Sequence, residues 1–287
     1  MRTPRSLHGA STVTRRALLA FAMFVTTACS GYSDVTDPHD SAPPPPPPGH
    51  LLLKDVVVSN LPSPFYHFDY DEAGTITGAS FASGLRSYVA SYGGGKLREM
   101  RNIVPATDER LVYSYDDAGR VGAVHYVDAN GSTFTVVIYT YEGARLTGVE
   151  RQRRLGGPIV TDKRVALFYD ADENLEQLIV YRPYIAGVQD ETTTIDTFGQ
   201  YDAGINVDGF GLLHDDFFDH FVVLPGVRLQ KSNPRRQTRT GDGQTFTIDY
   251  GYDYAAGRPL GKHGDLTITN GADAGKHVQV SSTYTYY

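Results

Sequence analysis

The densest group of side chains that could do chemistry is the run His214-Asp215-Asp216-Phe217-Phe218-Asp219-His220. Histidine and aspartate exchange protons and bind metals near neutral pH. On a helix, Asp216 and His220 lie four residues apart on one face and could form an ion pair or an acid–base dyad. His214 and His220 are six residues apart, so one helix cannot offer both to one metal ion. A solvated amphipathic face explains the same run, and we predict no metal site and no cofactor.

A second group consists of tyrosines spaced two residues apart, Tyr113 with Tyr115 and Tyr139 with Tyr141. On a strand each pair points to one face. Such pairs pack across strands, at roughly 0.2 to 1 kcal/mol each, or form an exposed aromatic platform for sugar rings or a partner protein. We favour packing. The candidate binding residues are these four tyrosines together with Asp216 and His220.

Other motifs match known sites less well. Asp170-Ala171-Asp172-Glu173-Asn174 has the spacing of a calcium loop, but Leu175 and Tyr181 stand where an EF-hand requires Gly and Glu, so a hairpin turn is the prediction. Lys96 in Gly93-Gly94-Gly95-Lys96 is followed by Leu97 and not by the Ser or Thr of a phosphate loop. Carboxylates are plentiful, so a polysaccharide hydrolase stays open, with catalytic residues unknown.

The elements that must position these groups follow from a repeated motif, Tyr-x-Tyr-Asp-x-x-Gly-x-apolar. Its best copy is 113–121, and others stand at 68–76 and 139–146. The Asp and Gly suit the first and fourth positions of a type I turn. Each unit is therefore two strands and two turns. The predicted fold is all-β, an antiparallel meander of repeated hairpins that forms a curved open sheet or a partly closed barrel.

The C-terminal part departs from the repeat. Leu213, Phe217, Phe221 and Leu224 form an apolar stripe that predicts one short helix over 208–225, ended by Pro225-Gly226. Strands are expected to resume at 227–230, 245–254, 266–269 and 278–286. The alternating Thr283 to Tyr286 would form a closing strand.

The N-terminal region indicates a targeting segment. Four Arg precede the nine-residue apolar run 17–25, which suits a signal peptide and is too short to span a bilayer. We therefore expect a signal peptide over 1–28, a lipidated Cys29 with a proline-rich tether over 29–49, and a single β-domain over 50–287. Removal of the signal peptide's four Arg takes the formal net charge from −7 to −11. That acidity disfavours nucleic acid as a partner.

Thr26-Thr27-Ala28-Cys29-Ser30 resembles the lipobox of bacterial lipoproteins. The resemblance implies diacylation of Cys29, which is the only Cys in the chain. Ser30, by the same resemblance, favours the outer membrane. We therefore expect an outer-membrane lipoprotein with its periplasmic or surface face left open.

The motif Tyr115-Asp116-Asp117-Ala118-Gly119-Arg120 resembles the YD repeats of Rhs-type proteins, over roughly 65–180. A group of bacterial lipoproteins with YD-like β-domains is similar over nearly all of the mature chain, including Gln230-Lys231-Ser232-Asn233-Pro234. That likeness implies no activity. The expected function is a non-catalytic binding or scaffolding module, which we favour over an enzyme. The alternative is the hydrolase, and the expected partners are the membrane, through the lipid, and a glycan or an envelope protein.

Overall fold

The computed structural model describes residues 52–104, 108–217 and 219–287. The predicted signal peptide, Cys29 and the tether lie outside these residues. The regular secondary structure of the described chain is β-strand, apart from one short 3-10 helix, η1, at Gly209–Leu213. No helix in the described ranges is both long and apolar enough to cross a bilayer.

The repeated motif folds as a strand, a tight turn and a return strand. In the best copy the Asp116 carboxylate accepts a hydrogen bond from the backbone N–H of Arg120 at 2.8 Å, and the Asp116 carbonyl accepts one from the N–H of Gly119 at 2.9 Å. Gly119 has φ +81°, a left-handed conformation that costs glycine little. The register shifts where Tyr115 meets Val121, so a bulge follows the turn. The turn chemistry predicted from the sequence is therefore what aligns each hairpin.

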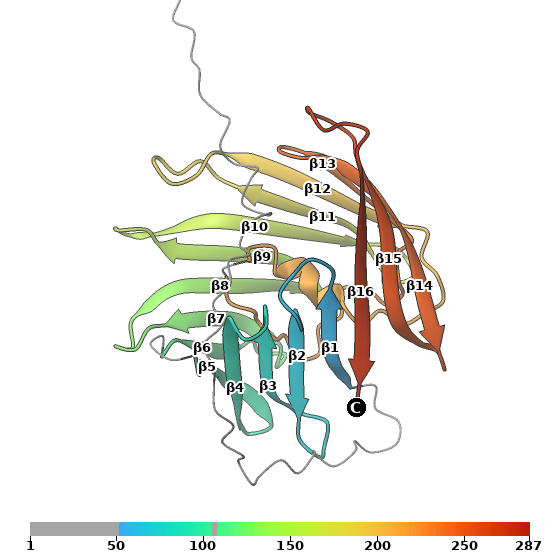
Figure 1. Ribbon diagram of the computed structural model, residues 1–287. Coiled ribbons are helices and arrows are strands. Elements are labelled where there is room, and N and C mark those ends of the chain that lie inside the picture. Colours follow the sequence, from blue (N-terminus) through green and yellow to red (C-terminus); the bar gives the residue numbers. More distant parts are fainter. Residues whose placement is uncertain (1–51, 105–107, 218) are drawn as a thin grey trace, which may run out of the picture. The chain divides into compact units, whose positions relative to one another are not determined.

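Sixteen antiparallel strands form a closed barrel in which each strand pairs with its neighbour in sequence, and β1 pairs with β16 (Figure 1). The all-β meander is confirmed, and it closes completely. The strands are β1 Leu53–Val58, β2 Tyr66–Tyr70, β3 Ile76–Phe81, β4 Arg86–Gly93, β5 Lys96–Asn102, β6 Arg110–Tyr115, β7 Val121–Val127, β8 Thr133–Glu142, β9 Arg145–Arg154, β10 Ile159–Tyr169, β11 Leu175–Arg182, β12 Thr192–Gly199, β13 Arg236–Gly241, β14 Phe246–Ala255, β15 Arg258–Ile268 and β16 His277–Tyr286.

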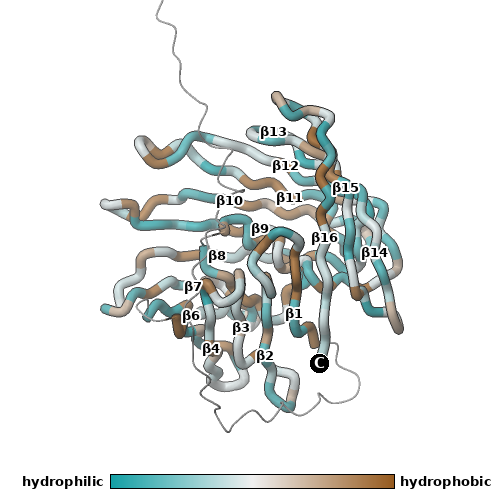
Figure 2. The backbone as a smooth tube through the Cα atoms, in the orientation of Figure 1, coloured by the Kyte–Doolittle hydropathy of each residue, from teal (hydrophilic) through white to brown (hydrophobic). Residues whose placement is uncertain are grey.

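Residues alternate along each strand between the lumen and the outside, and the hydropathy of the backbone tube alternates with them (Figure 2). On β2, Tyr66 and Phe68 are buried while Asp69 is exposed. On β8, Val137 and Tyr139 are buried while Ile138 and Thr140 are exposed. The hydrophobic core therefore lies inside the ring of strands.

The core is completed by residues 200–235, the connection between β12 and β13, which we call the plug. In Figure 1 it is the orange segment that lies inside the ring of strands. Its apolar side chains join those of the wall in one buried cluster, with Phe221 and Leu229 each 2% exposed. A barrel of this many strands leaves a wide lumen unless something occupies it. The plug occupies it.

The helix predicted over 208–225 is much shorter, because only Gly209–Leu213 is helical. Gly209 and Gly211 favour helix weakly, and the aspartates that follow reach charged groups on the wall. The four residues of the apolar stripe, Leu213, Phe217, Phe221 and Leu224, nevertheless all pack on the core. The strand predicted over 227–230 is wrong: these residues belong to the plug, and the strand after it is β13.

Candidate functional site

The barrel has two ends with different connections. The motif turns at 71–75, 116–120, 143–144, 170–174 and 256–257 share one end, which we call the motif rim. The connections at 82–85, 128–132, 155–158 and 183–191 share the opposite end, the loop rim. The described chain begins at Leu52 on the motif rim, where the backbone N–H of Tyr287 donates to its carbonyl at 3.2 Å.

The second tyrosine of each motif copy joins consecutive repeats. The Tyr115 hydroxyl donates to the carbonyl of Leu97 at 2.6 Å, and the Tyr141 hydroxyl donates to that of Val121 at 3.0 Å. In both cases the acceptor is the carbonyl of the apolar residue that follows the turn of the preceding hairpin. The same bond recurs from Tyr92 to Ile76, from Tyr169 to Leu146 and from Tyr201 to Leu175. These tyrosines therefore hold neighbouring hairpins together.

Basic residues reinforce this arrangement. The ammonium of Lys96 lies 4.8 Å from the centre of the Tyr115 ring, and the guanidinium of Arg120 lies 4.7 Å from that of Tyr141. Each such cation–π contact is worth about 0.5–1 kcal/mol at a surface. Burial raises the pKa of Tyr141 to about 12, so its hydroxyl stays protonated as a donor at neutral pH.

The first tyrosine of each pair points into the lumen. Tyr113 and Tyr139 are each 7% exposed. The Tyr113 hydroxyl donates to the carbonyl of Val223 on the plug at 3.0 Å. The structure thus places these two candidate residues in the packed interior, and neither offers a free aromatic face to solvent.

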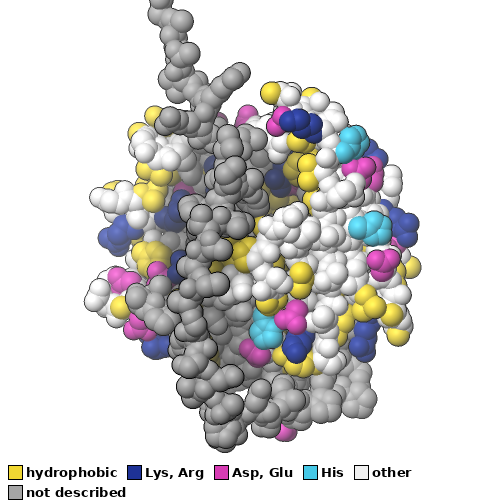
Figure 3. Space-filling view, in the orientation of Figure 1, with side chains coloured by type: hydrophobic (Ala, Val, Ile, Leu, Met, Phe, Trp, Pro, Cys, Tyr) yellow, Lys and Arg dark blue, Asp and Glu magenta, His cyan; other side chains and the backbone are white. Residues whose placement is uncertain are grey.

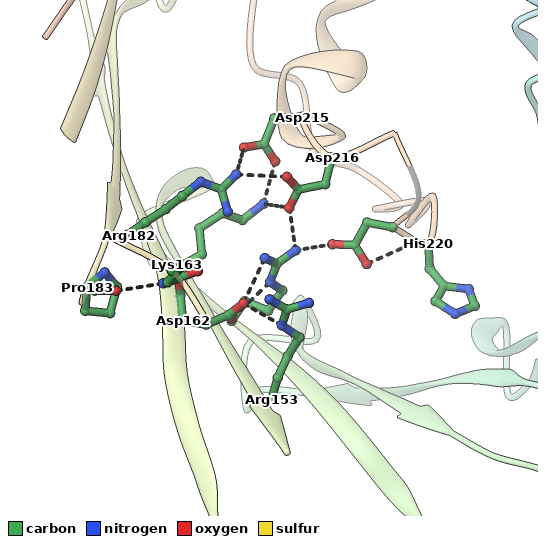
Figure 4. A network of polar contacts seen from close by, with 11 residues as sticks. Arg153, Asp162, Lys163, Arg182, Pro183, Asp215, Asp216 and His220 are labelled. Carbon is green, nitrogen blue, oxygen red and sulfur yellow. Dashed lines mark hydrogen bonds and ion pairs between the residues drawn. The ribbon is translucent and has the colours of Figure 1, made fainter. Parts of the chain in front are cut away.

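The aspartates of the plug meet four basic residues of β9, β10 and β11 in a charged network (Figure 4). Arg151 binds Asp162 through two nitrogens, at 3.1 and 2.9 Å, and reaches Asp216 at 2.7 Å. Its side chain is only 3% exposed. The remaining contacts join Arg151 to Asp219, Arg153 to Asp162, Lys163 to Asp215, and Arg182 to both Asp215 and Asp216.

Charges balance in this network, with four carboxylates facing four cations. Burial alone would lower the pKa of Arg151, yet Asp162, Asp219 and Asp216 raise it above its ordinary value. Burial would raise the pKa of Asp216, but Lys163, Arg182 and Arg151 lower it to about 2. Arg151 and Asp216 are therefore ionised at neutral pH, and the network holds the plug against one side of the wall.

His220 does not pair with Asp216; each binds a different part of the wall. The Tyr88 hydroxyl donates to Nδ1 of His220 at 2.8 Å, and Nε2 lies 3.1 Å from a carboxylate oxygen of Glu109. A neutral imidazole with its proton on Nε2 satisfies both bonds. Burial and the neighbouring Arg86 lower the pKa of His220 to about 4, against the opposing charge of Asp219.

Other contacts fasten the plug around the rest of the ring. His214 Nδ1 lies 2.9 Å from the hydroxyl of Tyr66 on β2. On the far side, Asp208 accepts a hydrogen bond from Tyr284 of β16 at 2.7 Å and forms an ion pair with Lys262 of β15. The plug is therefore bound to strands on several sides of the lumen.

The two stems of the plug are joined by the Gln230-Lys231-Ser232-Asn233-Pro234 element. The amide of Asn206 donates to Gln230 at 3.2 Å and to Asn233 at 3.1 Å. The carboxamide oxygen of Asn174 accepts from the backbone N–H groups of Lys231 and Ser232. This element of the sequence thus has a structural role at the base of the plug.

A cavity opens beside the plug at each rim. The charged mouth, at the loop rim, has a volume of about 600 Å³ and is lined by network residues together with Arg86, Glu109 and His220. The apolar mouth, at the motif rim, has a volume of about 370 Å³ and lies between the plug and strands β1 to β3. Both volumes fall within the range of small-ligand pockets, about 300–1,000 Å³.

The outer face of the wall is polar, and charged side chains are spread over the face seen in Figure 3. On β9, Glu150 binds Arg164 at 3.0 Å and Gln152 at 2.7 Å. Other outward pairs are Asp55 with His67, Glu99 with Arg101, Arg236 with Asp249, and Asp265 with His277. Exposed apolar residues such as Val89, Ile138 and Phe168 occur singly among them. The outside of the barrel is therefore suited to water.

The short basic cluster Arg151-Gln152-Arg153-Arg154 lies at the end of β9, and Arg151 is buried at the centre of the network. The alternation of Val149, Arg151 and Arg153 on one face was the signal that could have found it. Asp170 caps a hairpin turn as predicted, accepting from the N–H groups of Asp172 and Asn174. Within the described ranges no group of three or more His, Cys, Asp or Glu is arranged for a metal.

Comparison with known proteins finds likeness at the level of fold. No protein-family model and no curated protein matches the chain. A porin-like protein from Bacteroides uniformis aligns over 83% of this chain and 95% of its own, with 13% identity and a TM-score of 0.54. A porin-like protein from Bacteroides vulgatus aligns over 82% and 99%, with 12% identity and a TM-score of 0.54. The chain thus shares a barrel fold with these two proteins.

Proposed function

We propose that the protein is an outer-membrane lipoprotein. Its plugged barrel is a non-catalytic binding module whose outer face is exposed to water and not to lipid. The observation that carries the proposal is the charged outer wall around an occupied lumen. A barrel that spans a membrane presents lipid with an apolar band about 25 Å tall. Here Glu150 and Arg164 pair on that face, in the middle of their strands. The barrel then needs another attachment, which diacylated Cys29 and the tether would supply.

Two further observations support this function. The likeness to porin-like barrels favours a place in the bacterial envelope. The plug, tied to the wall by Arg151 and His220, favours binding at the mouths over conduction through the lumen. A glycan or an envelope protein remains the predicted kind of partner, and the two mouths are the surfaces on which to look for it.

The hydrolase alternative gains no support from the charged mouth. A glycosidase needs a carboxylic acid whose pKa is raised so that it can donate a proton. The pKa of Asp216 is instead lowered to about 2 by its basic neighbours. Asp215 and Asp219 likewise each face a cation. These carboxylates stabilise the plug, so we do not propose hydrolysis.

Two variants test the proposal. In the native host, radiolabelled palmitate should enter the wild type and not Cys29→Ser. A second chain, in which residues 1–29 are replaced by a cleavable secretory leader, should appear in the aqueous fraction without detergent and unfold cooperatively. Equal palmitate labelling of wild type and Cys29→Ser would refute the anchor. A leader-swapped chain that is recovered folded only in detergent would refute the water-facing barrel.

A further inference from the structure

We propose that the apolar mouth binds one long-chain fatty acid, with the acyl chain between the plug and β1 to β3 and the carboxylate at Arg228. The inference rests on the proposed function, since it supplies a ligand for the binding module. It is carried by three features of the cavity: its lining, the charge at its edge and its place on the barrel.

The lining is suited to hydrocarbon. Phe68, Tyr70 and Ile76 contribute from the wall, and Phe210 and Val227 contribute from the plug. Apart from Arg228 at the edge, the polar side chains among the lining residues already have partners. The Tyr70 hydroxyl donates to the carbonyl of Leu53 at 2.9 Å, and the amide of Asn206 binds Asp208, Gln230 and Asn233. A ligand that enters therefore meets mainly apolar side chains, which favours an apolar chain.

Arg228 provides the charge at the edge of this cavity. It is exposed, lies between Val227 and Leu229, and lines the same mouth. Among the residues that the structure describes, no ion pair includes it, whereas Arg151 and Arg182 at the other end are fully paired. A cation beside an apolar cavity complements an amphiphile with one anionic head. A carboxylate could bind the guanidinium through two oxygens.

The place of the mouth fits a ligand that comes from a membrane. It opens at the motif rim, where the described chain begins at Leu52. The proposed anchor at Cys29 joins the barrel to the bilayer through this end of the chain. A cavity of about 370 Å³ stands near the lower limit for ligand pockets, which suits one chain better than a two-chain phospholipid.

The acyl site can be tested with the leader-swapped full mature chain, which needs no detergent to compete for the pocket. Fluorescence of 11-(dansylamino)undecanoic acid should show saturable binding with one site per chain. Ile205→Trp, which fills the mouth from a residue 47% exposed, should weaken binding at least tenfold. Ile103→Trp, at the loop rim and 54% exposed, should bind like the wild type. Absence of saturable binding, or equal weakening by both variants, would overturn the proposal.

The head-group contact needs a second comparison. Dodecanoate and dodecanol, used to displace the dansyl probe, differ only in charge and the head oxygens. Arg228→Gln should weaken dodecanoate about fivefold or more and leave dodecanol unchanged. Arg154→Gln, an exposed residue at the loop rim, should change neither. An unchanged dodecanoate affinity in Arg228→Gln would overturn the assignment of the head group.

Three outcomes distinguish a failure of this inference from a failure of the proposed function. A leader-swapped chain that is folded in water but does not bind the probe refutes the fatty acid and leaves the module intact. Displacement of the probe by phosphatidylethanolamine vesicles more effectively than by dodecanoate would refute the single-chain ligand. A chain that cannot be recovered without detergent refutes the proposed function itself.

Discussion

At the scale of single residues, the plug depends on groups whose ionisation is set by burial. His220 is neutral in the folded protein and bridges Tyr88 and Glu109. Asp216 is ionised and bridges Arg151 and Arg182. Both belong to the run that first suggested catalysis. Their partners on the wall turn that run into a set of contacts that hold the plug to β2, β4, β9, β10 and β11.

The histidine makes stability depend on pH. The pKa of His220 is about 4 in the folded state against 6.5 when unfolded, so between these values only the unfolded chain takes up the proton. Stability should therefore fall by roughly 2 to 3 kcal/mol as the pH drops from 6.5 to 4. Urea unfolding of the wild type at pH 7.0 and 4.5 measures this loss.

His220→Gln is the matched variant, because an amide can accept from Tyr88 and donate toward Glu109 without titrating. Between pH 7.0 and 4.5 the free energy of unfolding of this variant should change far less than that of the wild type. Most of the wild-type loss of roughly 2 to 3 kcal/mol comes from the titration of His220. Equal pH dependence in both proteins would mean that the imidazole is not held neutral.

At the scale of elements, the motif is a connector between hairpins. Its aspartate and glycine form the turn, and its second tyrosine reaches back to the copy before. The bond from Tyr141 to Val121 and that from Tyr115 to Leu97 repeat along one rim. Because this bond links each copy of the motif to the copy before it, the tyrosine recurs once per two-strand unit.

Tyr141→Phe should destabilise the barrel by about 1 kcal/mol, because it removes one hydroxyl donor from a half-buried carbonyl and leaves the ring in place. Tyr184→Phe is the control, since Tyr184 is 63% exposed. Chemical denaturation of both variants makes the comparison. A Tyr141→Phe protein as stable as Tyr184→Phe would show that the hydroxyl does not join the repeats.

Local features of the fold could be predicted from the sequence, and distant pairings could not. The turn at Asp116 and Gly119 depends on neighbouring residues, so the motif alone was sufficient. The partners of Arg151 lie 65 and 68 residues away at Asp216 and Asp219, and nothing in the spacing links them. The predicted helix is shorter for the same reason: contacts with the wall outweigh the periodicity of Leu213 to Leu224. Neither the charged run nor the apolar stripe indicated by itself that the plug, residues 200–235, fills the lumen.

At the scale of the whole molecule, closure of the ring determines stability. β1 pairs with β16 on one side and with β2 on the other, so the barrel has no open edge. The register from Val56↔Tyr284 to Val58↔Ser282 connects the two ends of the domain. Whether a meander closes depends on the number and stagger of its strands, which the repeat did not reveal.

Deletion of residues 277–287 removes β16 and should abolish cooperative unfolding, because β1 and β15 then each lose a neighbour. Removal of Tyr287 alone deletes its contacts with Leu52 and Phe68 and should cost only about 1 kcal/mol. Size-exclusion chromatography and urea unfolding distinguish the two. A monomeric, cooperative protein without β16 would contradict the role of closure.

The pairing of β1 with β16 also has a consequence for biosynthesis. The hydrogen bond between Asp55 and Thr285 joins residues 230 positions apart, and a ribosome delivers the first long before the second. Until the last strand emerges, β1 presents an unpaired edge of the kind that chaperones and other strands recognise. Closure therefore requires β16: a chain interrupted before this strand keeps an open edge at β1 and is exposed to proteolysis.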